Sequence, residues 1–106
     1  MITRERVKEI TLEDIFLIAE ILSAIDISGV KFSGKSETEI GTSIMLKVMK
    51  SSKKIKKDFY QLIANVTEQP TETVKKTTFK ELMLIWETTK EINDLNSVFQ
   101  QAKEMI

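Results

Sequence analysis

Apolar side chains recur every three to four residues along most of the chain, which is the spacing of one face of an α-helix. The first such segment covers residues 12 to 25. It follows Thr11, whose hydroxyl can cap the helix while Asp14 completes a capping box three residues later. Its apolar positions cover more than half of the helix circumference, so we expect burial on more than one side.

That broad apolar surface allows two interpretations. The helix can lie in the centre of the core, or its surface can mediate self-association between two copies of the chain. In the second case the contact residues are Ile15, Ile18, Ile21, Leu22 and Ile25. We favour the central position, because broadly apolar helices are usually buried ones.

Residues 27 to 36 alternate between apolar and polar between two glycines, which predicts a loop or a short two-stranded hairpin. Helical spacing returns over residues 37 to 50, where Ile40, Ile44 and Val48 share a face, and again over residues 53 to 66. The two segments can form separate helices or one continuous helix, because no proline lies between them.

Pro70 ends this helical region, since proline cannot donate a backbone hydrogen bond and disfavours helical geometry at the residue before it. A one-turn helix is expected at residues 71 to 76. Thr78 and Glu81 form a second capping box, which opens a helix that ends near Asn93. A last helix then runs to the terminus. The sequence therefore predicts a single all-α domain over residues 1 to 106, with about four to five helices.

Composition narrows the class of protein. The chain has 106 residues, of which 42% are hydrophobic and 30% charged, and its 16 basic residues balance 16 acidic ones. No overall field therefore attracts it to nucleic acid or to an anionic membrane. The longest apolar run, residues 15 to 19, is far shorter than the ~20 residues of a membrane-spanning helix. The N-terminus is too charged for a signal peptide, and the lack of cysteine fits a reducing cytoplasm.

The residue types also limit the chemistry. The chain has no histidine and no cysteine, which excludes Ser-His and Cys-His nucleophilic sites and most zinc sites. The carboxylate pairs, such as Glu87 with Glu91, fit a solvent-facing role. We therefore expect no catalytic, metal-binding or cofactor-binding residues, and we do not interpret the chain as an enzyme.

Residues 29 to 36, Gly-Val-Lys-Phe-Ser-Gly-Lys-Ser, formally match the phosphate-binding P-loop pattern. The motif needs a buried strand before it and a helix after it, within a large α/β sheet. The preceding segment here is helical and the chain has no such sheet. We interpret the match as chance.

Lysines concentrate between the two middle helical segments, at Lys47, Lys50, Lys53, Lys54, Lys56 and Lys57. Such a patch could contact nucleic acid phosphates, as in a small helical nucleic-acid-binding or regulatory protein. However, it contains no arginine and no interleaved aromatic residue. A solvated helix end is the favoured interpretation, and nucleic acid the alternative partner.

The last third of the chain is rich in large apolar residues. Core packing is the default for each of them, but in a small domain some of this surface can remain for a partner protein. The candidate partner-binding residues are Phe79, Met83, Trp86, Leu95, Val98 and Phe99.

Several segments together resemble the small tail assembly chaperones of long-tailed phages. These are the Leu-Glu-Asp start of the first helix with Ile-Leu-Ser-Ala-Ile at residues 21 to 25, Asp-Phe-Tyr-Gln-Leu-Ile-Ala at 58 to 64, the turn at 67 to 72 with Val74, Thr-Phe-Lys-Glu-Leu at 78 to 82, and Asn-Asp-Leu-Asn-Ser-Val-Phe at 93 to 99. The chain departs from the family at Gln100, where a second aromatic residue is common. The resemblance covers about residues 11 to 106.

This resemblance implies a helical, non-enzymatic protein of a phage or prophage, which acts in the cytoplasm of the host cell. Its partner would be the tape-measure protein, which it keeps soluble and presents to tail-tube subunits. Family members often self-associate, so the resemblance also implies a homo-oligomer. No membrane partner is expected.

Overall fold

The structure is a computed structural model that describes residues 7–25 and 37–105, and within those ranges the fold is all-α. Six helices lie in these ranges: α1 (Leu12–Ala24), α2 (Glu37–Met49), α3 (Lys53–Thr67), α4 (Thr71–Lys75), α5 (Phe79–Ile92) and α6 (Leu95–Glu104). The all-α prediction is confirmed. The described residues form one helix more than the four to five predicted, because residues 37 to 67 form two helices rather than one and the one-turn helix expected at 71 to 76 is also present, as α4. The loop or hairpin predicted at 27–36 lies outside the described residues.

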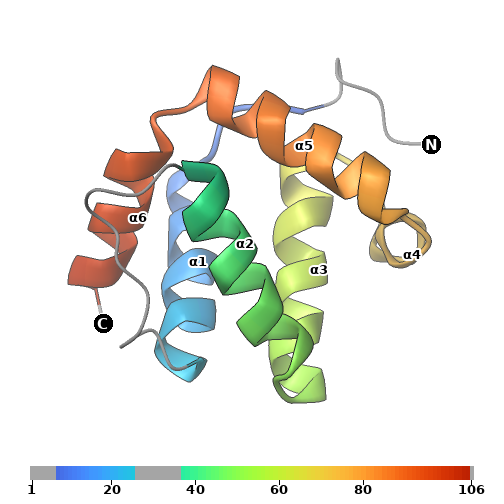
Figure 1. The fold of residues 1–106 in the computed structure, drawn as a ribbon, viewed down its shortest axis with the longest axis horizontal. Coiled ribbons are helices and arrows are strands. Elements are labelled where there is room, and N and C mark those ends of the chain that lie inside the picture. The colour runs from blue at the N-terminus through green and yellow to red at the C-terminus, as the bar shows by residue number, and fades with distance from the viewer. Residues whose placement is uncertain (1–6, 26–36, 106) are drawn as a thin grey trace.

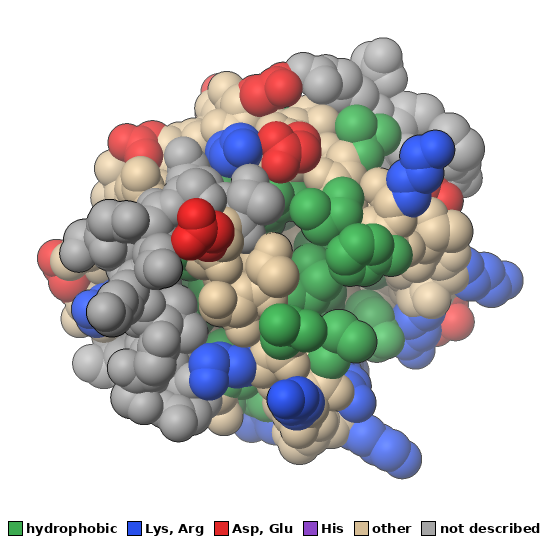
Figure 2. Space-filling view, viewed as in Figure 1, with side chains coloured by type: hydrophobic (Ala, Val, Ile, Leu, Met, Phe, Trp, Pro, Cys, Tyr) green, Lys and Arg blue, Asp and Glu red, His purple; other side chains and the backbone are tan. Residues whose placement is uncertain are grey.

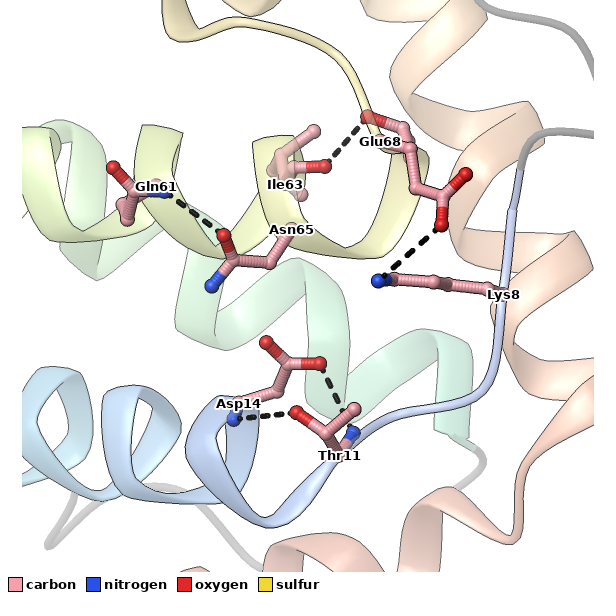
Figure 3. Close-up of polar contacts among 8 residues, drawn as sticks. Lys8, Thr11, Asp14, Gln61, Ile63, Asn65 and Glu68 are labelled. Atoms are coloured by element: carbon pink, nitrogen blue, oxygen red, sulfur yellow. Dashed lines mark hydrogen bonds and ion pairs between the residues drawn. The ribbon is translucent and has the colours of Figure 1, made fainter.

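Helix α1 begins as the sequence predicts. The Thr11 hydroxyl accepts a hydrogen bond from the Asp14 backbone N–H at 3.2 Å, and the Asp14 carboxylate accepts one from the Thr11 backbone N–H at 3.0 Å (Figure 3). Asp14 is almost completely buried. The bond from the Thr11 backbone N–H partly compensates for burying this charge.

Two serines separate α2 from α3. The Ser51 hydroxyl donates a hydrogen bond to the Val48 carbonyl at the end of α2, and the Ser52 hydroxyl accepts one from the Ile55 backbone N–H at the start of α3. Serine hydroxyls compete with helical backbone bonds and favour helix ends. Their presence explains why the alternative of one continuous helix is not adopted.

Helix α3 ends at Glu68, which adopts the left-handed conformation with φ of 54°. Its side chain forms an exposed ion pair with Lys8 at 3.6 Å (Figure 3), and Pro70 then caps α4. Left-handed geometry is unfavourable for a residue with a Cβ, whereas glycine adopts it freely. Residue type at this position therefore affects stability through the backbone.

We expect Glu68→Gly to raise the free energy of unfolding by about 0.5–1 kcal/mol, because relief of the left-handed strain exceeds the loss of an exposed ion pair. Urea denaturation monitored by circular dichroism measures the change. Glu68→Ala is the control, since it removes the carboxylate and keeps the strain. Equal stabilities of the glycine and alanine variants would contradict the prediction.

Helices α5 and α6 also begin with side-chain caps. Thr78 caps α5 by accepting a hydrogen bond from the Glu81 backbone N–H at 3.1 Å. Asp94 caps α6, where its carboxylate accepts hydrogen bonds from the Ser97 hydroxyl at 2.8 Å and from the Ser97 backbone N–H at 3.3 Å. These bonds, first the one from the Ser97 hydroxyl, lower the pKa of Asp94 below its usual value.

A carboxyl whose pKa is lowered by folding stabilises the native state above its unfolded pKa, and this contribution disappears as the pH falls through the folded pKa. We therefore expect Asp94→Asn, which preserves a capping oxygen, to lose less stability on acidification than the wild-type chain does. Thermal melts between about pH 2.5 and about pH 7 test this. Ser97→Ala should raise the pKa of Asp94 and likewise reduce the loss of stability at low pH. If both variants lose as much stability on acidification as the wild-type chain, the hydrogen bonds from Ser97 do not lower the pKa of Asp94.

The helices pack around α1, which contacts α3 on one side and α6 on another, while α2 contacts both α3 and α5. Figure 1 shows α5 running across one end of α2 and α3. The main core contains Ile15, Ile18, Ile21 and Leu22 of α1 and Ile25 directly after it, with Ile40, Val48, Ile55, Leu95, Phe99 and Ala102 from the other helices. The central position predicted for α1 is thus the one observed.

The chain before α1 forms hydrogen bonds with α3 and with the residue that follows α5. The Lys8 backbone N–H donates a hydrogen bond to the Val66 carbonyl of α3 at 2.9 Å. The Ile10 backbone N–H donates to the Asn93 side-chain oxygen, after α5, also at 2.9 Å. Val7 is buried with Val66 and Ile85 in a second cluster. This segment therefore helps to fix α5 relative to α3.

Candidate functional site

The described helices enclose an apolar cavity of about 100 Å³. Its inner wall is formed by core residues of α1 and α6, and its outer wall by α2, α3 and α5. Residues of the inner wall include Ile18, Ile21, Leu22, Leu95 and Phe99, and those of the outer wall include Ile44, Met45, Phe59, Leu62, Ile63, Leu82 and Trp86. Figure 2 shows hydrophobic side chains around a hollow over α2 and α3, beneath α5, so the cavity opens to the surface there.

The outer wall continues into exposed apolar side chains. On α2, Met49 follows Met45 by one helical turn and is 62% exposed. On α5, Phe79 precedes Leu82 by one turn and is 69% exposed. We call the cavity mouth together with these two rim residues the α2–α3–α5 groove. Exposed apolar side chains beside an apolar hollow are typical of protein-binding surfaces.

Trp86 occupies the junction of three helices at this groove. Its indole lies against Gly41 of α2, where an added Cβ would be 2.6 Å from Cη2 and 2.7 Å from Cε2 of the ring. On the other side it stacks on Phe99 of α6, with 6.0 Å between ring centroids and 20° between ring planes. The buried indole N–H has no hydrogen-bond partner among the described residues. Packing contacts, rather than a hydrogen bond, therefore hold this ring in place.

Lysines lie at one end of the groove. In the register of α3, Lys56 lies on the same face as Phe59 and Ile63 of the cavity wall. Lys53, one turn before Lys56, lies at the edge of that face, whereas Lys54 lies on the opposite face of the helix. Figure 2 shows lysines below and to the right of the hydrophobic side chains, and most of the acidic side chains in view above and to the left. The groove is therefore apolar in its centre and basic at the α2–α3 end.

The structure separates the six predicted partner-binding residues into two groups. Leu95 and Phe99 are buried in the core, where they line the inner wall of the cavity, and Val98 is half-buried against the core. Phe79 is exposed, and Met83 and Trp86 are partly exposed. The sequence interpretation missed Met45, Phe59, Ile63 and Leu82, and only the glycine at position 41 signalled a close helix approach there.

The five residues proposed for self-association, Ile15, Ile18, Ile21, Leu22 and Ile25, are all buried within the chain. In this fold they cannot form a surface between two copies. The exposed apolar residues of α1 are instead Leu12, at 62%, and Phe16, at 51%. They lie one turn apart, and neither lines the groove.

Other candidate chemistry can be placed only in part. The P-loop match at 29–36 lies outside the described residues. Within residues 7–25 and 37–105 no three acidic side chains are grouped as a metal site would require. No helix in the described part of the chain is long and apolar enough to cross a bilayer. Of the six patch lysines, Lys47 and Lys56 are half-buried, and the other four are exposed around different sides of α2 and α3.

Comparison of the chain with protein-family models, with curated proteins and with solved structures finds no match.

Proposed function

We propose that the chain is a phage tail assembly chaperone that binds the tape-measure protein and keeps it soluble during tail assembly. The observation that carries this proposal is the α2–α3–α5 groove, an apolar hollow with Met49 and Phe79 exposed one helical turn from its lining residues. A tape-measure protein is long and helical, so before assembly its apolar stripes face water. A groove between helices accommodates the apolar face of such a helix.

The mechanism is shielding. Client side chains that would aggregate are covered by the groove, and apolar burial supplies the binding free energy. Because the cavity accommodates little more than one large side chain, each contact is expected to be modest and reversible. Several copies of the chaperone can then cover one client and be displaced by tail-tube subunits as the tail forms. Such a function belongs in the cytoplasm of the host cell and involves no chemistry on the client.

The resemblance also supports a homo-oligomer. In this fold such an assembly would use surfaces other than the five buried positions Ile15, Ile18, Ile21, Leu22 and Ile25. Light scattering of the purified chain over a range of concentrations tests this part of the proposal.

The alternative function is nucleic-acid binding through the lysine patch. The lysines favour it by their number, but they surround the α2–α3 corner rather than form one stripe, and the groove beside them is apolar. Ionic strength discriminates between the two functions. Phosphate contacts weaken steeply as salt rises, whereas an apolar client interface does not.

The test is co-expression of the chain with the tape-measure protein of the same phage. We expect the client to be soluble with the chain and to aggregate without it, and the complex to survive nuclease and high salt. Phe16→Ser, outside the groove, is the control and should act as the wild type does. Aggregation of the client in the presence of the folded chain would overturn the proposal, as would recovery of only salt-labile nucleic acid.

A further inference from the structure

We infer that the groove selects client helices of one chemistry, in which a single large apolar side chain enters the cavity and acidic residues lie two to three turns away along the helix, beside Lys53 and Lys56. This inference rests on the proposed function and specifies its partner. Its grounds are the size and lining of the cavity and the position of the charges at one end of the groove.

The size of the cavity indicates what enters it. Pockets for metabolites and cofactors measure roughly 300–1,000 Å³ and contain several placed polar groups. This cavity is about 100 Å³, and the one hydroxyl in its wall, that of Thr89, already donates a hydrogen bond to the Ile85 carbonyl. Apolar cavities of this kind stay dry and bind apolar groups. One leucine-sized or phenylalanine-sized side chain is the occupant that its volume and lining fit best.

The positions of Lys53 and Lys56 along α3 determine how far they lie from the client side chain that occupies the cavity. The cavity-lining residues Phe59 and Ile63 lie one and two turns beyond Lys56, and Lys53 lies about one turn before it. With a rise of ~1.5 Å per residue, the two lysines lie about 10–15 Å along the helix axis from the middle of the cavity-lining stretch of α3, residues 59 to 66. A client helix lying along α3 would therefore meet positive charge about two to three turns from its anchor. Among the described residues, neither lysine has an ion-pair partner.

Acidic residues on the client at that distance would complement the positive charge of the two lysines. Acidic side chains on the client would pair with Lys53 and Lys56 at the edge of an apolar contact, where ion pairs add mainly specificity. Basic side chains at the same place would be repelled, and the groove would reject them. Lys54, on the opposite face of α3, is outside this contact.

Synthetic helical peptides without tryptophan provide the probe. The first carries one central leucine in an alanine and glutamine background, with three glutamates two to three turns away. It is made with the acidic turn at either end, because the groove does not fix the direction of the client helix. The second peptide replaces the leucine by alanine, and the third replaces the glutamates by lysines. Trp86 is the only tryptophan of the chain and lines the cavity, so its fluorescence reports entry of the anchor.

We expect the acidic leucine peptide to bind and to shift the Trp86 emission. Loss of the leucine should weaken binding by about 10-fold or more and abolish the shift. Exchange of glutamate for lysine should weaken binding by about 3-fold to 10-fold at low salt, and this difference should shrink at high salt. Equal binding of the glutamate and lysine peptides, or of the leucine and alanine peptides, would overturn the inference.

Charge-reversal variants of the protein show whether Lys53 and Lys56 themselves select the peptide or whether the net charge of the protein does. Lys53→Glu/Lys56→Glu should reverse the preference towards the lysine peptide. The same change of net charge on the opposite side of α3, in Lys54→Glu/Lys57→Glu, should leave the glutamate preference in place. Equal effects of the two double variants would overturn the inference. If no peptide binds while the tape-measure protein is still kept soluble, this inference fails and the proposed function stands.

Discussion

Gly41→Ala should lower the free energy of unfolding by about 1–3 kcal/mol, although alanine is the better helix former by ~1 kcal/mol. The reason is the close approach of α5. A Cβ at position 41 would lie within 2.7 Å of three atoms of the Trp86 indole. Stacking on Phe99 hinders movement of that ring away from α2. The cost of overpacking therefore exceeds the gain in helix propensity.

The control is a substitution of Trp86, the second residue of this contact. Trp86→Phe shortens the side chain and removes the ring atoms that a Cβ at position 41 would meet. In that background Gly41→Ala should be neutral or stabilise the fold by up to ~1 kcal/mol. Urea denaturation of the four chains measures the coupling. Equal costs of Gly41→Ala in both backgrounds would show that the close approach of α2 and α5 does not exist in solution.

Met49→Ser/Phe79→Ser should weaken client binding about 10-fold to 100-fold and leave the fold intact. Both side chains are more than half exposed, so little of their packing is lost on substitution. In the complex, covering each of them would contribute of the order of 1 kcal/mol or more. Titration of the client into both chains by calorimetry or fluorescence measures the difference.

The matched control is Leu12→Ser/Phe16→Ser, which removes a similar exposed apolar pair from α1, outside the groove. This variant should bind the client as the wild-type chain does. Circular dichroism must show unchanged helix content and melting in both variants. Equal loss of binding in the two pairs would mean that general surface hydrophobicity, rather than the groove, holds the client.

Most helix boundaries could be predicted from the sequence, because local interactions set them. Thr11 with Asp14 and Thr78 with Glu81 act within one helical turn, and Pro70 restricts the backbone through its own ring. The sequence does not decide between a break and a continuous helix at α2 and α3, because the serine hydrogen bonds that end α2 and begin α3 are individually weak.

The groove could be predicted only in part, because exposure depends on how the helices meet. Leu95 and Phe79 both lie on apolar stripes of their helices, yet one is buried and the other is 69% exposed. The difference arises from contacts between segments far apart in the sequence, such as Trp86 with Gly41 and Ile10 with Asn93. Periodicity within one helix contains no information on those contacts.

Site-specific photo-crosslinking shows whether the client lies in the α2–α3–α5 groove. Benzoylphenylalanine replaces Phe79 at the rim of the groove in one chain and Phe16 on α1 in another, so that two exposed phenylalanine positions are compared. Each chain is irradiated with the tape-measure protein. We expect a crosslink from position 79 and none from position 16. A crosslink from position 16 alone would mean that the client binds at α1 and not in the groove.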